Sequence, residues 1–464
     1  MRTKPKGRQV NVDVAVADGS RARKAAIGSF VGAVVEWYDF LLYGIIAALV
    51  FNSQFFPSVS PAVGVMAAFA TFGVGFLFRP LGGIFFGHFG DRLGRKRMLI
   101  WTMLLMGVAT ALIGLVPNFE SIGWFAPLLL VLLRAIQGFA VGGEWGGASL
   151  MAVESAPAKK KAFYSSGVQV GYSVGLILAT GAVTIMSNLL SDDAFTSWGW
   201  RVPFLASAVL VLFGLWIRSG VEESPVFEQA VEESGEKKKL PVIQAITEHP
   251  GSFLKIIALR MAELFTMYIV TTFALSYTVN ELGYERQFML NVALLVGGIG
   301  ILSIPTYAAI ADRFGRKPIF VTGAVVGALA AVPFFLSLQA ASVVAIVILA
   351  VILVNVSHDM VVSVQQPLFT EMFGPELRYS GAGVGYQVAS AIAGGFTPFI
   401  AAALVSWNDG SWHYVAAYLA LGCVISAVVA ALMKNMGSSD VTSISDQVAP
   451  AAEAVVAERV SKSV

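Results

Sequence analysis

The chain has 464 residues, of which 56% are hydrophobic and 13% are charged, and its formal net charge is +2. Soluble domains usually carry about 25% charged residues, so this composition excludes an ordinary soluble domain and predicts that most side chains face lipid or other helices. The single cysteine excludes an internal disulfide. The polar, basic N-terminal stretch does not have the pattern of a removable signal peptide, so we expect the first apolar run to remain as a membrane helix.

Apolar stretches of about 20 residues, the length that crosses the hydrocarbon core as a helix, recur along the chain. We predict six of them near residues 27–51, 63–86, 98–116, 124–147, 164–187 and 200–218. We predict six more near residues 253–277, 288–310, 319–338, 342–364, 383–407 and 415–433. The expected fold class is therefore an all-α membrane protein with twelve transmembrane helices in two pseudo-symmetric six-helix halves.

These segments predict how the chain is divided. We expect an N-terminal tail, a first half, a Glu- and Lys-rich linker, a second half and a C-terminal tail, at residues 1–24, 25–219, 220–251, 252–434 and 435–464. Lys and Arg gather in the loops on one side of the predicted helices, and Arg286 is the one exception. Because such loops face the cytoplasm, we expect a multi-pass protein of the inner (plasma) membrane with the linker and both tails in the cytoplasm.

A short motif occurs once in each half, about half a chain length apart. GHFGDRLGRK covers residues 87–96, and AAIADRFGRK covers residues 308–317. Its glycines permit a tight turn, and its aspartate can cap a helix or pair with a charge. One copy is equally well explained as a basic turn that orients the chain. Two copies at corresponding places favour a repeated gating element, in a carrier whose substrate site lies between the halves.

The repeated motif resembles the signature loop of the major facilitator superfamily, in which it helps to hold one conformation of alternating access. The resemblance implies gating roles for the charged residues in and near both copies, namely Asp91, Arg92, Arg95, Asp312, Arg313, Arg316, Glu154, Glu371 and Arg378. Ala308 stands where the first copy has Gly87, so we expect the second latch to be the weaker one.

Four further stretches resemble the bacterial metabolite:proton symporter family, namely EWYDFLLYG (36–44), FLFRPLGG (76–83), RAIQGFAVGGEWGGA (134–148) and WRVPF (200–204). Members of that family carry proline and betaine, α-ketoglutarate, citrate or shikimate. Other stretches, such as RYSGAGVGYQVAS (378–390), are most similar to the members that carry shikimate. The resemblance implies a proton-coupled importer of a small organic acid, with shikimate favoured. Another carboxylate, or proline or betaine, remains an alternative because a few pocket residues decide the substrate.

Carboxylates inside predicted spans are candidates for proton coupling, because a charged group at mid-bilayer costs at least about 2.5–3.5 kcal/mol. These candidates are Glu36, Asp39, Glu144, Glu263 and Asp359. A carboxyl group in a low-dielectric interior can take up and release a proton near neutral pH. For Glu36 and Asp39 the alternative is that one of the two carboxylates pairs with a nearby arginine and serves folding.

Substrate binding calls for donors and acceptors that face the space between the halves. A guanidinium grips a carboxylate through two parallel hydrogen bonds, so Arg134 is the expected anchor. An internal pair with Asp39 or Glu144 is its alternative. The full set of expected substrate-binding residues is Arg134, Gln137, Gln169, Tyr172, Asn355, Gln366, Tyr386 and Gln387.

Other classes of function find less support. The sequence contains no histidine cluster with metal-ligand spacing, no G-x-S-x-G nucleophile elbow and no P-loop, so we expect neither an enzyme nor a transport ATPase. A non-transporting nutrient sensor would be expected to carry a large cytoplasmic extension, whereas both tails are short. We expect an organic acid, protons and the lipid bilayer as partners, with no nucleic acid, cofactor or metal. A monomer is expected to suffice because one chain holds both halves.

Overall fold

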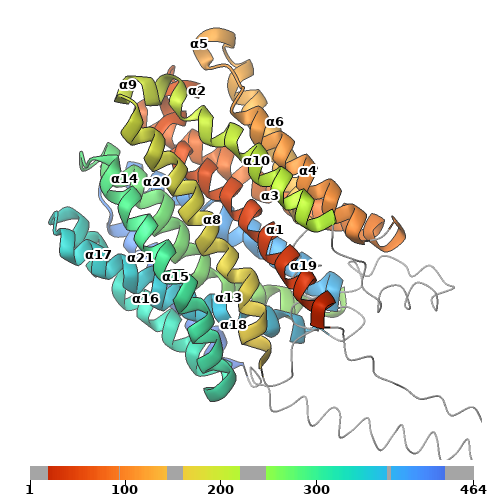
Figure 1. Cartoon of the computed structure of the whole chain (residues 1–464). Coiled ribbons are helices and arrows are strands. Elements are labelled where there is room, and N and C mark those ends of the chain that lie inside the picture. The colour runs from red at the N-terminus through yellow and green to blue at the C-terminus, as the bar shows by residue number, and fades with distance from the viewer. Residues whose placement is uncertain (1–18, 94, 144–159, 220–246, 374–377, 434–464) are drawn as a thin grey trace, which may run out of the picture.

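A computed structural model describes residues 19–93, 95–143, 160–219, 247–373 and 378–433, and these form a bundle of helices without a strand (Figure 1). The short helices α2 (Asn52–Phe55), α5 (Phe119–Ile122) and α9 (Asp192–Ala194) lie together at one end of the bundle. The second copy of the repeated motif lies at the other end, which we call the latch end. The sequence predicts that this end is cytoplasmic.

The first half contains the helices before residue 220. Its long first helix, α1 (Gly19–Ile46), continues through a π-helical turn (Ala47–Phe51) into α2. The other long helices are α3 (Pro61–Leu93), α4 (Arg95–Ile113), α6 (Phe125–Gly142), α8 (Lys161–Leu189) and α10 (Arg201–Ser219), the last preceded by a π-helical turn (Phe195–Gly199).

The second half contains the helices after residue 246. They are α13 (Pro250–Tyr268), α14 (Ala274–Asn280), α15 (Arg286–Phe314), α16 (Arg316–Gln339), α17 (Val343–Val351), α18 (Asp359–Glu371), α19 (Arg378–Ala389), α20 (Thr397–Trp407) and α21 (His413–Leu432). Three π-helical turns, Ile269–Phe273, Ile352–His358 and Ser390–Gly395, join α13 to α14, α17 to α18 and α19 to α20. Such turns often occur at functional sites, and here each adjoins buried polar residues.

The described residues include nine helices that are long and apolar enough to cross a membrane, or ten when the bent pair Asp192–Gly199 and Arg201–Ile217 counts as one span. Each of the twelve predicted segments coincides with helix in the described part. The third predicted segment is the shorter apolar helix Arg97–Ile113. The seventh consists of α13, its π-helical turn and α14, and α13 carries the charged residues Lys255, Arg260 and Glu263.

Small residues allow the helices of each half to pack closely. α3 packs along α6, where a Cβ at Gly138 would lie 1.7 Å from the carbonyl oxygen of Gly75. A Cβ at Gly82 would lie 1.7 Å from the carbonyl oxygen of Phe139, so these backbones touch and only glycine fits. At the latch end Gly315, with φ +98°, makes the tight turn between α15 and α16 that the repeated motif predicts.

The two halves meet along two main seams. On one side α8 packs against α15 and α18, and on the other α3 packs against α19, its π-helical turn and α20. Outward-facing positions are apolar, as at Trp216, Leu302 and Leu329, which suits contact with lipid. The charged and polar side chains gather inside the bundle, on the helices that form or adjoin these seams.

Candidate substrate and proton site

Arg134 lies on α6 with its side chain fully buried. Its Nη1 donates to Gln137 Oε1 at 3.1 Å, and its Nε donates to the Phe72 carbonyl at 3.5 Å. The guanidinium stacks on the rings of Phe40 and Tyr43, with Cζ 3.9 Å and 4.3 Å from their centres. Its Nη2 has no hydrogen-bond partner among the described side chains and backbone groups, so this nitrogen is available to a ligand.

The sequence allowed Arg134 to form an internal ion pair instead. The structure places no described carboxylate oxygen within 4.0 Å of its nitrogens, and Asp39 acts on it only at longer range. Glu144, the other partner considered, lies outside the described residues. The geometry therefore favours a role for Arg134 in binding an anionic ligand over an ion pair between Arg134 and Asp39.

Asp39 is connected to Arg134 through two neutral side chains. Gln137, which accepts from Arg134, donates through Nε2 to Thr110 Oγ1 at 2.6 Å. Thr110 in turn donates to Asp39 Oδ2 at 2.7 Å, with the Met106 carbonyl at 2.9 Å as the alternative acceptor for its hydroxyl. A chain of three hydrogen bonds therefore links a guanidinium to a fully buried carboxylate on another helix.

Glu36, one turn before Asp39 on α1, faces a different arginine. Its Oε1 lies 3.7 Å from Arg79 Nη1, and both side chains are almost fully buried. Arg79 lies on α3, and its Cζ is 3.9 Å from the ring centre of Phe40 and 4.2 Å from that of Phe76. Glu36 is thus held in an ion pair inside the first half.

The second half contains a tighter ion pair on α13. Arg260 Nε and Nη2 donate to the two carboxylate oxygens of Glu263 at 3.1 and 3.0 Å. Arg260 Nη1 donates to the Tyr386 carbonyl at 2.9 Å and to the Ser390 hydroxyl. Gln365 Nε2 donates to Glu263 Oε2 at 2.7 Å. Burial and this bidentate geometry make the pair a fixed part of the second half.

Asp359 lies where the π-helical turn Ile352–His358 passes into α18, and its side chain is fully buried. It accepts from Asn355 Nδ2 at 3.0 Å and from the Ser303 hydroxyl, and His358 Nδ1 lies 2.8 Å from its Oδ1. The His358 ring packs against Tyr172 of the first half, with ring centres 5.0 Å apart. A second buried carboxylate therefore lies near the seam between the halves.

Several expected substrate-binding residues have polar atoms without a partner among the described residues. Besides Arg134 Nη2, they are both amide atoms of Gln366 and of Gln387, the Oδ1 atom of Asn355 and the hydroxyl of Tyr172. Gln169 Nε2 reaches across the seam to the Val362 carbonyl at 3.4 Å, and Tyr386 places its ring under Arg260, 3.4 Å from Cζ. Buried amides are normally hydrogen-bonded, so these groups are suited to a ligand rich in hydroxyls.

The hydroxyl of Tyr268 also lacks a described partner, and this side chain lies among groups of both halves. Its ring packs edge-on against Phe72 and Phe76 of the first half, with centres 5.4 and 5.9 Å away. It is within electrostatic range of Arg79, Arg134 and Arg260. Tyr268 therefore marks the place where the arginines of the two halves converge.

At the latch end the second motif copy holds the first half directly. Asp312 accepts from the backbone N–H groups of Ala162 and Phe163, in the first turn of α8, at 3.1 and 2.9 Å. Glu371 pairs with Arg316 at 2.7 Å and with Lys161 of α8 at 3.4 Å. A carboxylate at a helix N-terminus is favoured by the unpaired N–H groups and by the helix dipole.

Of the remaining gating candidates, the structure describes the side chain of Arg313 alone. Arg313 is exposed and lies over the ring of Phe314, 5.2 Å from its centre. Outside what the structure describes lie the side chains of Asp91, Arg92, Arg95 and Arg378, together with all of Glu144 and Glu154.

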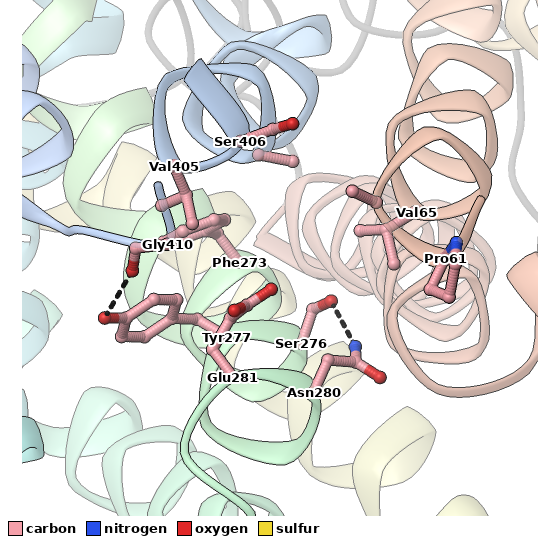
Figure 2. A pocket seen from close by; sticks show the side chains of 12 residues that line it. Pro61, Val65, Phe273, Ser276, Tyr277, Asn280, Glu281, Val405, Ser406 and Gly410 are labelled. Carbon is pink, nitrogen blue, oxygen red and sulfur yellow. Dashed lines mark hydrogen bonds between the residues drawn. The ribbon is translucent and has the colours of Figure 1, made fainter. Parts of the chain in front are cut away.

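The end opposite the latch contains a cavity of about 300 Å³ between α3, α14 and α20. Figure 2 shows Val65 facing it from α3, Tyr277 and Glu281 near the end of α14, and Ser406 from α20. Tyr277 donates to the Gly410 carbonyl at 3.3 Å across its rim. The α3 side of the bundle is therefore hollowed at this end.

The α8 side is closed at the same end by Arg286. This residue begins α15, and it donates to Ser187 Oγ at 2.6 Å and to Asp192 Oδ1 at 2.7 Å, both in the first half. Its Cζ also lies 4.4 Å from the ring centre of Phe195. Arg286, the exception to the predicted charge asymmetry of the loops, is thus a clamp between the halves.

Sequence reasoning missed several members of this site. Arg79 could have been identified from the sequence, because a lone arginine within an apolar span indicates a functional or structural role inside the bundle. Thr110, Ser303 and Lys161 carried no such signal, because Thr and Ser are common in membrane helices and Lys161 belongs to a basic cluster. Among the described residues no group of three or more His, Cys, Asp or Glu side chains is arranged to hold a metal ion.

Comparison with known proteins agrees with this architecture. The family model of the Major Facilitator Superfamily matches residues 29–394 and 265–457. The Shikimate transporter of Escherichia coli (strain K12) is 65% identical over 417 residues, covering 90% of this chain and 95% of that protein. A glycine betaine/proline/ectoine/pipecolic acid transporter of Dickeya dadantii is 36% identical over 433 residues, covering 91% and 85%.

Solved structures show the same fold. A partially occluded inward-open conformation of the xylose transporter XylE from E. coli has a TM-score of 0.69 at 18% identity, covering 89% of this chain and 97% of that one. A D-xylose-proton symporter has a TM-score of 0.68 at 17% identity, covering 90% and 98%. The matched relatives are transporters rather than enzymes. The chain belongs to the major facilitator superfamily.

Proposed function

We propose that this protein imports shikimate, a small monocarboxylic acid, together with protons across the inner membrane by alternating access. The latch end and both termini would face the cytoplasm, and a monomer would suffice. The 65% identity to a shikimate transporter over nearly the whole of both chains supports the substrate. The pocket of buried donors and acceptors supports a polyhydroxylated acid as the ligand.

The observation that carries the proposal is the hydrogen-bond chain from Arg134 to Asp39. The substrate carboxylate would bind the Arg134 guanidinium, using the Nη2 that has no described partner. Asp39 would carry the proton. Because Gln137 and Thr110 join the two groups, a change at either end alters the hydrogen bonding at the other.

Protonation of Asp39 reverses one bond in this chain. The ionised carboxylate can only accept, so the Thr110 hydroxyl donates to it. A protonated Asp39 can donate instead, and the Thr110 hydroxyl then turns to the Met106 carbonyl, 2.9 Å away. The proton removes a buried negative charge near Arg134. The electrostatic potential at Arg134 then becomes more positive, so an incoming carboxylate is attracted more strongly. Proton and substrate would therefore favour each other's binding.

The other three described candidates for proton coupling, Glu36, Glu263 and Asp359, have different roles in the proposed transport cycle. Glu36 and Glu263 are engaged by Arg79 and Arg260, so we assign them to the charge balance of the site. Asp359, with three polar neighbours beside the seam, is the proposed second proton-binding carboxylate. The amides of Gln366 and Gln387, with the hydroxyl of Tyr172, would bind the substrate hydroxyls.

Gating would follow from contacts at the two ends. Asp312 and Glu371 hold α8 at the latch end, and Arg286 holds it at the other end. The cavity beside Tyr277 would be the start of the route from outside, because it lies on the side that Arg286 does not close. Both sets of contacts are formed in this structure, so rocking of one half against the other would break one set and keep the other.

Uptake of labelled shikimate into cells that lack their own carrier tests the proposal. We expect saturable uptake that an uncoupler abolishes and that Arg134→Ala loses while still reaching the membrane. Absence of uptake above the empty vector, from protein shown to be in the membrane, would rule out shikimate. A competition panel of other carboxylates and betaines would then identify the substrate, since a betaine and proline transporter is also a relative.

A further inference from the structure

The cavity at the end opposite the latch carries a negative charge. Glu281 is the one charged side chain among the described residues that line it, and this side chain is exposed. Figure 2 shows Glu281 next to Tyr277 at the end of α14. A Cβ at Gly410 would lie 3.4 Å from Glu281 Oε2, so the carboxylate reaches across the cavity rim towards the segment that follows α20.

No described cation balances this carboxylate. The structure places no Lys, Arg or His nitrogen of the described residues within 4.0 Å of Glu281. Arg286, the nearest basic residue in the sequence, is engaged by Ser187 and Asp192 of the first half. An anion in this cavity would be repelled, whereas a cation would be attracted. The cavity therefore has the opposite charge preference to the Arg134 site.

Two aromatic rings form part of the cavity wall. Phe273 and Tyr277 both line the cavity, and their rings stack with centres 5.7 Å apart and an angle of 21° between their planes. Tyr277 also lies within electrostatic range of Glu281. The face of an aromatic ring attracts a cation, and quaternary ammonium ligands are bound by such rings. The rings and the carboxylate thus favour the same class of ligand.

The rest of the wall is neutral. Val65 of α3 and Val405 of α20 contribute apolar surface, and Ser276 accepts a hydrogen bond from Asn280 Nδ2 at 3.0 Å. The volume of about 300 Å³ lies at the lower end of the range of about 300–1,000 Å³ that small-molecule sites occupy. A compact ligand with methyl groups fits this space better than an extended one.

We propose that this cavity binds a small organic cation, namely an ammonium group that carries a compact apolar body. The positive charge lies between the Glu281 carboxylate and the rings of Phe273 and Tyr277. Because α3 belongs to the first half and α14 and α20 belong to the second, a bound cation bridges the halves and slows their rocking. It therefore inhibits transport. The site is separate from Arg134, so the proposal does not depend on which substrate is carried.

Protection of an engineered cysteine from a maleimide tests the site. Ser406 is exposed and lines the cavity, so Ser406→Cys in a Cys423→Ser background reports whether the cavity is occupied. The probes are choline and 3,3-dimethylbutan-1-ol, which have the same shape and differ in that a carbon replaces the charged nitrogen. Labelling is measured at constant ionic strength in nanodiscs of phosphatidylglycerol, a lipid without an amine. Ser197→Cys, exposed at the same end but outside the cavity lining, is the control position.

Choline is expected to slow the labelling of Ser406→Cys in a saturable manner and to leave that of Ser197→Cys unchanged. Loss of the charge, either in 3,3-dimethylbutan-1-ol or in Glu281→Gln, is expected to weaken protection by about fivefold or more. Glu285→Gln changes another exposed carboxylate that does not line the cavity, and this matched control should keep the protection seen without it.

Three results would overturn the proposal. They are no protection by choline, equal protection by the two probes, and protection by choline that is unchanged in folded Glu281→Gln. Nanodiscs that contain phosphatidylethanolamine separate a lipid source of the ammonium group from a soluble one. Slower labelling there without choline, reversed by Glu281→Gln, would identify the lipid headgroup as the cation that the cavity binds.

The effect on transport is measured by uptake of labelled shikimate into proteoliposomes. Choline chloride is expected to lower the initial rate relative to sodium chloride at the same concentration, and to be about fivefold less potent in Glu281→Gln than in Glu285→Gln. Saturable protection without inhibition would contradict the bridging of the halves. If the wild-type protein takes up no shikimate, the proposed substrate is wrong, and the labelling experiment still tests the cation site.

Discussion

Arg79 and Arg134 lie against the same ring, that of Phe40, although they belong to different helices and differ in their partners. Arg79 has Glu36 beside it at 3.7 Å, whereas Arg134 donates to the neutral Gln137 at 3.1 Å. An aromatic face stabilises a buried cation without neutralising it. Arg134 is therefore held in place and remains fully charged towards a carboxylate ligand.

Arg134→Lys is expected to lower kcat/KM for shikimate uptake by about 10- to 100-fold, because an ammonium keeps the charge but cannot form the two parallel bonds of a guanidinium. Uptake kinetics, normalised to the amount of protein in the membrane, measure this effect. Lys255→Gln, a charge change on the exposed surface of α13, is the matched control and should leave uptake unchanged. Unaltered kinetics in Arg134→Lys would mean that the guanidinium does not hold the carboxylate.

Asp39→Asn is expected to separate exchange from uphill transport. The amide has the shape of the carboxylic acid but cannot ionise, so the variant should still exchange labelled for unlabelled shikimate while losing accumulation driven by a proton gradient. Counterflow and gradient-driven uptake in proteoliposomes measure the two activities. Accumulation at the wild-type level in Asp39→Asn would assign the proton to another group, and Asp359→Asn would be tested next.

Thr110→Val is expected to weaken coupling without removing either charged group. Valine has the shape of threonine but no hydroxyl, so it breaks the link between Gln137 and Asp39. The loss of about one buried hydrogen bond on each side costs on the order of 1–3 kcal/mol. It should lower the proton concentration needed for half-maximal uptake, because the Thr110 hydroxyl no longer stabilises the ionised carboxylate of Asp39. A pH profile identical to that of wild type would show that the chain of hydrogen bonds does not carry the coupling.

Asp312→Ala is expected to favour opening at the latch end. It removes the cap of α8, a loss of about 0.5–2 kcal/mol, which corresponds to an approximately 2- to 30-fold change in the conformational equilibrium. A cysteine at Ser166, in a Cys423→Ser background, should then be labelled faster, since Ser166 lies one turn before Gln169 on the seam face of α8. Asp193→Asn, an exposed carboxylate at the other end, is the control.

Arg286→Gln is expected to act in the opposite direction. It removes the contacts to Ser187 and Asp192, so the end away from the latch should open more often. A cysteine at Ser276, which lines the cavity at that end, should label faster, while one at Ser166 should label more slowly. If both cysteines label faster, the clamp stabilises the whole bundle and does not select between its conformations.

Gly138→Ala is expected to destabilise the first half, because its Cβ would lie 1.7 Å from the Gly75 carbonyl oxygen and α6 would have to move from α3. Overpacking of this kind costs about 1–3 kcal/mol or more. Thermal unfolding in detergent measures it. Gly167→Ala on α8, where the added Cβ meets nothing within 4 Å, is the matched control and should unfold at the wild-type temperature.

Hydropathy and the repeated motif were sufficient to predict the fold. Every predicted span coincides with described helix, because about 20 apolar residues in lipid have few alternatives to a helix. The family comparison confirms the prediction of a major facilitator fold. The five π-helical turns in the described part of the chain were not predicted, since they change the helical register without changing composition.

The site was predicted only in part, for a definite physical reason. Asp39 and Arg134 could be identified because charge is costly inside a membrane helix. The Thr110 link could not, because it joins residues 71 positions apart and depends on how α1, α4 and α6 are rotated about their axes. Hydropathy does not encode that rotation. For the same reason, the pairing of Glu36 with Arg79 could not be predicted from the sequence.

Proton-coupled import of shikimate is tested by accumulation of the labelled acid in proteoliposomes that contain the purified protein, under an imposed proton gradient. We expect shikimate to concentrate inside when the outside is more acidic, and collapse of the gradient by a proton ionophore to release it to equal concentrations. Entry that is the same with and without the gradient would contradict proton coupling. No entry of shikimate under either condition, by protein that is folded and inserted, would contradict the substrate.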